Sequence, residues 1–295
     1  MTETQQAWQR LGAHLGASVE SVERLTGGVS AEVYLLTLRK ATGIREHVVL
    51  REKATTLAQE LLAMRHARSQ GLPVPPVTAI PEGLTPSGLP ALAMPWVAGT
   101  TAIDQAHPEP QLRAMADALV ALHQLPTKGL EPLPRLLDPL PELPGFLAVD
   151  PAFEPIAAWL SRRPSTPYRG SLALLHGDFW PGNLLWREGS LQAMLDWEDT
   201  HLGDPHVDVA LTRLELRYLL GSEGTGSFTT RYRAQASLDE ERLALWDCYV
   251  AAAALTYMGS WGLPKDEVAH MRREATAFIH EAAAYLSALS EKRRR

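Results

Sequence analysis

The most constraining stretch of the chain lies between residues 172 and 196, where two apolar runs enclose a tight turn. A first apolar run ends at Asp178, and a loop that contains proline and glycine leads from there to Asn183. The runs 184–186 and 191–195 then bracket a four-residue turn, which is the pattern of a β-hairpin. The pattern therefore predicts that Asp178 and Asn183 lie at the two ends of one tight loop beside a small sheet.

A third polar residue, Asp196, follows the second strand of this predicted hairpin directly. Three polar side chains are thus expected to converge on one edge of the sheet. Phosphoryl transfer needs such a group, because Mg²⁺ takes oxygen ligands and a carboxylate must orient the attacking hydroxyl. Asp and Asn in Gly/Pro loops are commonly turn formers. The joint pattern of His176-Gly177-Asp178, Asn183, the hairpin and Asp196 favours catalysis over that alternative.

The chain divides into two regimes of secondary structure. Residues from about 19 to 98 are rich in β-prone runs around one helix, and the residues beyond 100 are mostly helical. We expect an α+β fold with two lobes, 1–98 and 99–295, and a ligand in the cleft between them. The expected strands are 31–38 and 47–52, joined by a turn, with a further apolar run at 92–97. The expected helices are 55–70, 109–125, 237–258 and 265–290.

Three segments of the helical region carry more specific predictions. The proline-rich segment 126–170 is expected to be irregular or to form short helices. The glycine-rich segment 221–227 is expected to be a flexible loop between helices. Ser237 with Glu240 three residues later predicts a capping box at the start of a helix.

Composition narrows the classes of protein that the chain can belong to. Hydrophobic residues make up 45% and charged residues 21%, as in an ordinary soluble globular protein. The net charge of −6 argues against a nucleic-acid partner. The single cysteine excludes an internal disulfide and fits a reducing compartment. No apolar run approaches the roughly 20 residues of a membrane span and no signal sequence begins the chain, so we expect a cytoplasmic protein; the sequence gives no oligomeric state.

The residues around this loop resemble those of the aminoglycoside phosphotransferase family. The resemblance rests on His-Gly-Asp-Phe-Trp-Pro-Gly-Asn at 176–183, Leu-Asp-Trp-Glu at 195–198 and Gly-Asp-Pro-His-Val-Asp at 203–208. That family is related to choline and homoserine kinases and shares the protein-kinase-like fold. The resemblance implies a small antiparallel-sheet lobe with one helix and a larger helical lobe, with ATP or GTP and Mg²⁺ in the cleft. Asp178 would be the catalytic base, and Asn183 and Asp196 would bind Mg²⁺.

Weaker motifs upstream are interpreted as the nucleotide-binding part of the same fold. Gly27, Gly28 and Ser30 look like a loop that covers the phosphates, with a plain turn as the alternative. Arg51 stands where the fold places its phosphate-pairing lysine, and a guanidinium can grip two phosphate oxygens. Lys53 lies on the same strand face and is the second candidate for that role.

Other residues complete the predicted site. Glu60, on the following helix, looks like the ion-pair partner of Arg51, with a surface glutamate as the alternative. The run with Met94, Trp96 and Val97 resembles the segment between the lobes that binds adenine, with an edge strand as the alternative. His176 and Asp208 are interpreted as structural residues that hold the catalytic loop, and Asp208 also opens a helix. The candidates for contact with the phosphoryl acceptor are Trp180, Glu198 and Asp199, with Glu154 as a further acid.

We therefore expect a Mg-dependent phosphotransferase that moves the γ-phosphoryl of ATP or GTP to a hydroxyl of a small molecule. A protein substrate is disfavoured, because Asp204-Pro205 follows Asp196 too soon for a long activation segment. A P-loop kinase is excluded, since the chain has no G-x-x-x-x-G-K-[ST]. Two alternatives remain: a catalytically silent nucleotide-binding protein of the same fold, and an interaction protein that docks partners on 126–170. The sequence does not identify the acceptor.

Overall fold

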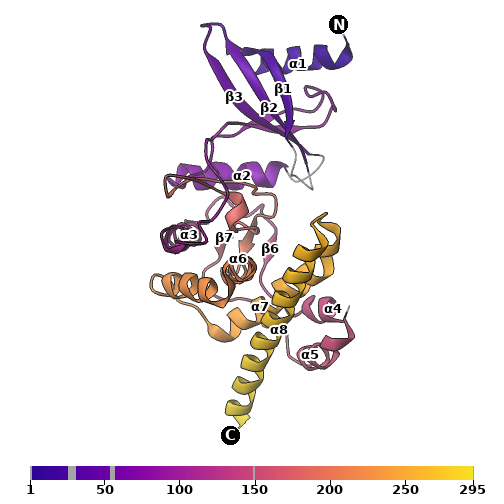
Figure 1. The fold of residues 1–295 in the computed structure, drawn as a ribbon, viewed down its shortest axis with the longest axis vertical. Coiled ribbons are helices and arrows are strands. Elements are labelled where there is room, and N and C mark those ends of the chain that lie inside the picture. Colours follow the sequence, from indigo (N-terminus) through magenta and orange to yellow (C-terminus); the bar gives the residue numbers. More distant parts are fainter. Residues whose placement is uncertain (1, 26–30, 54–56, 149, 295) are drawn as a thin grey trace.

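The computed structural model describes residues 2–25, 31–53, 57–148 and 150–294, and it places them in two lobes (Figure 1). The first lobe is built on an antiparallel sheet of five strands in the order β1-β2-β3-β5-β4. The strands are β1 (Ala17–Leu25), β2 (Glu32–Lys40), β3 (Arg45–Glu52), β4 (Thr78–Ile80) and β5 (Ala91–Pro95). The helices of this part are α1 (Glu3–His14) and α2 (Leu57–Ser69).

The two faces of this sheet have different tasks. Leu36 and Leu50 are fully buried and cluster with Leu11 of α1, which covers one face. Because successive residues of a strand point to opposite faces, Arg51 of β3 and Lys53, which directly follows β3, project from the other one. That face looks toward α2 and the second lobe, so the register of β3 places two basic side chains where the lobes meet.

The second lobe is mainly helical and forms a large buried core. Two small sheets, β6-β10-β7 and the hairpin β8-β9, lie at its side nearest the first lobe. The strands are β6 (Arg135–Leu136), β7 (Ala173–Leu175), β8 (Leu184–Arg187), β9 (Ser190–Met194) and β10 (His201–Gly203). The helices are α3 (Glu109–His123), α4 (Leu143–Leu147), α5 (Glu154–Leu160), α6 (His206–Arg233), α7 (Glu240–Tyr257) and α8 (Lys265–Arg294), with 3₁₀ turns η1 (Pro151–Phe153), η2 (Pro181–Asn183) and η3 (Met258–Ser260).

Most of the predicted elements are confirmed, including the α+β class, the β2–β3 hairpin, α2, α3, the short helices within 126–170 and α8. The β8–β9 hairpin is also confirmed, and its turn is tighter than expected because Arg187 pairs with Ser190. The two turn residues, Glu188 and Gly189, have φ values of 52° and 74°, as a type I′ turn requires. Among the described residues, no helix is long and apolar enough to cross a membrane.

Two local predictions are wrong. The capping box at Ser237 does not form, because α7 begins later and Asp239 is its N-cap, with its side chain accepting from the Arg242 N–H at 3.0 Å. The segment 221–227 is not a loop: only Gly221 leaves the helical conformation, with φ 67° and ψ −164°. It divides α6 into two arms, and Thr225 Oγ1 of the second arm donates to Arg213 O of the first at 3.1 Å. Packing between the arms thus overrides the low helix propensity of the glycines.

Candidate active site

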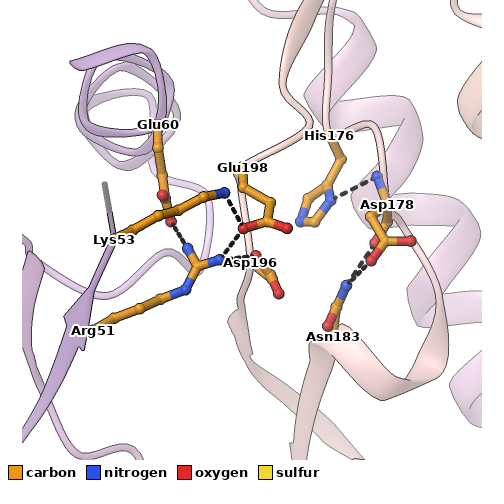
Figure 2. A network of polar contacts seen from close by, with 8 residues as sticks. All are labelled: Arg51, Lys53, Glu60, His176, Asp178, Asn183, Asp196 and Glu198. Atoms are coloured by element: carbon orange, nitrogen blue, oxygen red, sulfur yellow. Dashed lines mark hydrogen bonds and ion pairs between the residues drawn. The ribbon is translucent and has the colours of Figure 1, made fainter. Parts of the chain in front are cut away.

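The loop that carries the predicted catalytic residues connects β7 to β8 and brings Asp178 and Asn183 into direct contact (Figure 2). Asn183 Nδ2 donates to Asp178 Oδ2 at 2.7 Å and to the Asp178 carbonyl at 2.9 Å. The η2 turn, Pro181–Asn183, makes this contact possible. One 3₁₀ turn reverses the direction of the chain, so that Asn183 comes back to Asp178. The amide oxygen of Asn183 is left facing away from Asp178.

Gly177 sets the path of the loop. Its φ is 84°, in the left-handed region that favours glycine. A Cβ at this position would lie 1.8 Å from the carbonyl oxygen of Asp199. The loop therefore packs so closely against the segment after Asp196 that a side chain at position 177 does not fit. The His-Gly-Asp motif therefore contains glycine for a steric reason, and this contact holds Asp199 next to Asp178.

Asp208, in the first turn of α6, binds the backbone of the loop and holds it in place. It is fully buried, and its two oxygens accept from the backbone N–H of His176 at 2.8 Å and of Gly177 at 3.0 Å. His123 Nε2 of α3 lies 3.2 Å from the same carboxylate. One helix turn further along α6, Thr212 Oγ1 donates to the Phe179 carbonyl at 2.7 Å. The loop therefore rests on one face of α6.

His176 is enclosed by the core. Its ring stacks near Trp197, with centroids 4.6 Å apart, and its Nδ1 accepts from the Asp178 N–H at 3.4 Å. Burial lowers the pKa of His176 to about 4, against the opposing charge of Asp208, so the ring is neutral at physiological pH. This environment supports the structural role predicted for His176 and for Asp208.

The surroundings of Asp178 suit a group that exchanges a proton. Burial raises the pKa of Asp178 to about 7, and hydrogen bonds from Asn183 and Trp180 oppose the shift, while the charges of Asp199 and Asp196 add to it. Trp180, a predicted acceptor contact, is thus a neighbour of Asp178, and its ring lies against Gly182, where a Cβ would meet it at 2.2 Å. A carboxylate whose pKa lies near the working pH is suited to act as a general base.

The opposite side of the site is a network of charged residues from both lobes (Figure 2). Arg51 Nη1 donates to Glu60 Oε1 of α2 at 2.5 Å, and Arg51 Nη2 donates to Asp196 Oδ1 at 2.8 Å. Glu198 accepts from both Arg51 and Lys53. The structure therefore brings Glu198, predicted as an acceptor contact, to the basic side chains Arg51 and Lys53. It also places Arg51 and Lys53 side by side on Glu198, so both stay candidates for the phosphate-pairing residue.

Asp196 adopts an unusual backbone conformation for a residue other than glycine, with φ 58°. Such conformations concentrate at functional sites. Burial raises the pKa of Asp196, against the opposing charge of Arg51. Within the part of the chain that the structure describes, no group of three or more His, Cys, Asp or Glu is arranged to hold a metal ion. Asn183 and Asp196 nevertheless fit Mg²⁺, which usually takes one or two protein oxygens and completes its shell with phosphates and water.

The segment that joins the lobes begins where β5 ends. Trp96 N–H donates to the His47 carbonyl at 2.9 Å, and Thr100 pairs with Trp186 of β8 through hydrogen bonds of 2.9 and 2.8 Å. Between these anchors, the backbone of Val97 makes no hydrogen bond with any described residue. Met94 pairs with Val49 inside the sheet and offers only its side chain. The predicted phosphate loop of Gly27, Gly28 and Ser30 lies outside the described residues.

Sequence reasoning missed the supporting residues of this site outside the loop. These are His123 and Thr212, which hold the loop, and Glu215, whose pKa is raised by burial and by the charge of Asp178. The spacing Asp208, Thr212, Glu215 on a helix was available as a signal, because residues at i, i+4 and i+7 share a face. Glu154, in contrast, lies at the start of α5, a helix of the second lobe that is far from the five-stranded sheet of the first lobe (Figure 1).

The two-lobed fold and this loop together are typical of one class of enzyme, the phosphotransferases of kinase-like fold. The chain belongs to the phosphotransferase enzyme family, whose profile matches residues 21–246. Among curated proteins, the aminoglycoside 3'-phosphotransferase of Streptomyces fradiae is 26% identical over 250 residues, which are 78% of this chain and 90% of that protein. Acyl-CoA dehydrogenase family member 10 of Mus musculus is 28% identical over 232 residues, 69% of this chain. The match spans 21% of that longer protein.

Solved structures confirm the protein-kinase-like fold. A thermostable mutant of aminoglycoside phosphotransferase APH(4)-Ia, crystallised with AMP-PNP and hygromycin B, superposes with a TM-score of 0.67 at 17% identity, covering 93% of this chain and 98% of that one. The macrolide 2'-phosphotransferase MphH from Brachybacterium faecium gives a TM-score of 0.59 at 22% identity and covers 94% of this chain and 98% of that one. The small antiparallel lobe and the larger helical lobe are thus those of this class of enzyme.

Proposed function

We propose that the protein transfers the γ-phosphoryl group of ATP to a hydroxyl of a small molecule, with Asp178 as the base. The observation that carries the proposal is the arrangement of two opposed groups around the meeting point of the lobes. Asp178 and Asn183 stand on one side, and Arg51 and Lys53 with Asp196 on the other (Figure 2). This arrangement offers a base for the hydroxyl and cations for the phosphates, as phosphoryl transfer requires.

Each residue has a separate task in the proposed reaction. Arg51, held by Glu60, and Lys53 would bind phosphate oxygens, and Val97 would offer its free backbone groups to the adenine edge. Asn183 and Asp196 would hold Mg²⁺, which when bound neutralises charge on the phosphates. Asp178 would orient the acceptor hydroxyl and accept its proton as the oxygen attacks phosphorus. GTP in place of ATP would use the same phosphate contacts.

The relatives support the direction of this proposal. The Streptomyces fradiae relative is an aminoglycoside phosphotransferase, and a structural neighbour was crystallised with AMP-PNP and with ADP in separate complexes. A small-molecule acceptor and a nucleotide donor are therefore proposed for this chain as well. The short connection from Asp196 to α6 agrees with a small acceptor, because no long segment intervenes to dock a protein.

The test is the isosteric substitution Asp178→Asn. Turnover should fall about 10²–10⁴-fold, the usual contribution of a positioned base, while Mg·ATP binding is largely retained. A coupled ADP-release assay over alcohols, amino alcohols, sugars and antibiotics identifies the acceptor, and calorimetry measures ATP binding. The matched control is Asp266→Asn, an exposed position in the first turn of α8, which should leave both values unchanged.

Wild-type turnover in the Asp178→Asn variant would refute the assignment of the base. ATP binding without transfer to any acceptor in the wild-type protein would instead favour a catalytically silent nucleotide-binding protein. The two outcomes are distinguishable, because the first needs an active enzyme and the second lacks one.

A further inference from the structure

Glu198, in the segment between β9 and β10, ties the second lobe to two cations of the first. Its Oε2 atom accepts from Arg51 Nη2 and from Lys53 Nζ, so a single carboxylate oxygen bridges both (Figure 2). The two cations stand 147 and 145 residues before Glu198 in the chain. The side chain of Glu198 is 17% exposed, so most of this bridge is shielded from water.

The bridge has the chemistry of a phosphate contact. A carboxylate oxygen and a phosphate oxygen both accept charge-assisted hydrogen bonds from guanidinium and ammonium groups. In the proposed function, Arg51 and Lys53 are the side chains that bind the phosphates of the nucleotide. Glu198 therefore occupies, from within the chain, the places that phosphate oxygens would take on these two cations.

The hydrogen bonds of Arg51 show that the two kinds of ligand compete. Each Nη atom of a guanidinium carries two hydrogens. Nη2 donates to Asp196 Oδ1 at 2.8 Å and to Glu198 Oε2, which accounts for both of its hydrogens. Nη1 donates to Glu60 Oε1 at 2.5 Å. A phosphate oxygen can thus bind Nη2 only after Asp196 or Glu198 has left it.

Of the acidic partners of Arg51, Glu198 is the one whose departure helps the nucleotide. Glu60 is only 1% exposed, and separating a buried pair leaves a charge without compensation. Asp196 is proposed to hold Mg²⁺, so it keeps a cation when the nucleotide is bound. Burial raises the pKa of Asp199, and the charges of Glu198 and Asp196 raise it further. Negative charge is therefore crowded here, and phosphates add to it unless Glu198 moves away.

We propose that Glu198 is an internal competitor of the nucleotide: its carboxylate binds Arg51 and Lys53 in the nucleotide-free protein and leaves both when the phosphates bind. The apparent affinity for nucleotide is then lower than that of the open site, because the site is open in only a fraction of the molecules. The same competition favours the release of ADP after transfer. The inference rests on the proposed function and adds a residue that regulates its nucleotide side.

Binding of ADP without Mg²⁺ tests the inference, because no metal ion then contributes to the affinity. Calorimetry on the full chain in EDTA should show that Glu198→Gln binds ADP at least about tenfold more tightly than the wild type, a difference of 1.4 kcal/mol. The amide keeps the shape of the carboxylate but holds the cations more weakly, because it carries no charge. Glu198→Asp is the second variant, and it should also bind ADP more tightly, because the shorter side chain reaches the cations less well.

The matched control is Asp199→Asn, which removes a negative charge from the next residue of the same segment. The described side chains of Arg51 and Lys53 make no hydrogen bond with Asp199, so this variant should change the affinity for ADP much less. Equal tightening in Asp199→Asn and Glu198→Gln would attribute the effect to charge alone and overturn the inference.

An affinity for Mg-free ADP that is unchanged, lower or undetectable in both Glu198 variants would also overturn it. If the variants lost affinity only when Mg²⁺ was added, Glu198 would be a ligand of the metal instead. Failure of the wild-type protein to bind Mg·ATP would refute the proposed function. The two failures are separable, because the first compares variants of a protein that binds nucleotide and the second needs no variant.

Discussion

At the scale of single residues, Gly177 shows how a steric contact fixes the path of the loop that carries Asp178. Gly177→Ala would force a side chain into the left-handed region and against the Asp199 carbonyl, which lies 1.8 Å from the ideal Cβ position. The loss should exceed the roughly 1–2 kcal/mol of left-handed strain alone, because backbone atoms must also move apart. Denaturant unfolding measures the stability, and turnover should fall with it as Asp178 is displaced.

The control for this substitution is Gly189→Ala in the β8–β9 turn. Gly189 has a φ of 74°, and nothing lies within 4 Å of the ideal Cβ position. This variant should therefore lose only the stability that left-handed strain costs, about 1–2 kcal/mol. Equal losses in the two variants would show that the contact with Asp199 yields at no cost.

Glu215 predicts a dependence of stability on pH. Its pKa is raised from 4.5 in the unfolded chain to about 8 in the folded one, by burial and by the charge of Asp178. The folded state therefore binds more protons between these values, and the contribution of Glu215 to stability is present below pH 4.5 and is lost as the pH rises through about 8. Glu215→Gln should remove this loss and make the protein more stable than wild type at the upper end of the window.

Urea unfolding of the wild type and the variant across that window measures the effect. Glu223→Gln should follow the wild type, because that glutamate is exposed. If the curves of stability against pH were parallel for wild type and Glu215→Gln, the carboxyl group would not be in the environment described. This result is independent of any acceptor, because no ligand is present in the measurement.

At the scale of elements, α6 holds the loop that carries Asp178 and Asn183. Asp208 in its first turn satisfies two backbone N–H groups of the loop, and Thr212 satisfies a carbonyl. The sequence identified Asp208 as a loop anchor from its place at the start of a helix. It did not reveal that Thr212, on the same face of the arm, also binds the loop, because this contact depends on how the loop packs on the helix.

Asp208→Asn tests the role of this helix. An amide offers one acceptor oxygen where the carboxylate offers two, so one buried N–H of the loop loses its partner, at a cost of about 1–3 kcal/mol. Thermal unfolding should show the lower stability, and kcat should fall more than the affinity for Mg·ATP, because Asp178 is misplaced while Arg51 and Lys53 are not. Asp117→Asn, at an exposed site of α3, is the control. Unaltered kcat would mean that the loop keeps its shape without α6.

At the scale of the whole molecule, the site depends on contacts that no local pattern contains. The run 172–196 predicted the hairpin and the meeting of Asp178 with Asn183, because spacing and turn chemistry are local properties. Arg51 and Asp196 are 145 residues apart in the chain, and their ion pair follows from how the lobes pack. For the same reason, the contacts of Glu198 with Arg51 and Lys53 could not be assigned from the sequence.

The ion pairs of Arg51 join the two lobes, and they give the last prediction. Arg51→Met would leave Glu60, only 1% exposed, without the partner of its Oε1, while its Oε2 has no partner among the described residues. Breaking a buried pair in this way costs about 3–5 kcal/mol, whereas replacing both members with apolar residues is often neutral. Arg51→Met should therefore lower the melting temperature, and the double variant Arg51→Met/Glu60→Leu should recover most of it.

Binding of Mg·ATP separates this structural effect from the proposed function. If Arg51 binds phosphate oxygens, the affinity stays low in the double variant even though the stability has returned. The control Arg24→Met removes an exposed pair with Glu32 on the same sheet, and it should change neither stability nor affinity, because exposed pairs contribute little. Recovery of both stability and ATP affinity in the double variant would show that Arg51 only supports the fold, and Lys53 would then be the phosphate-binding residue.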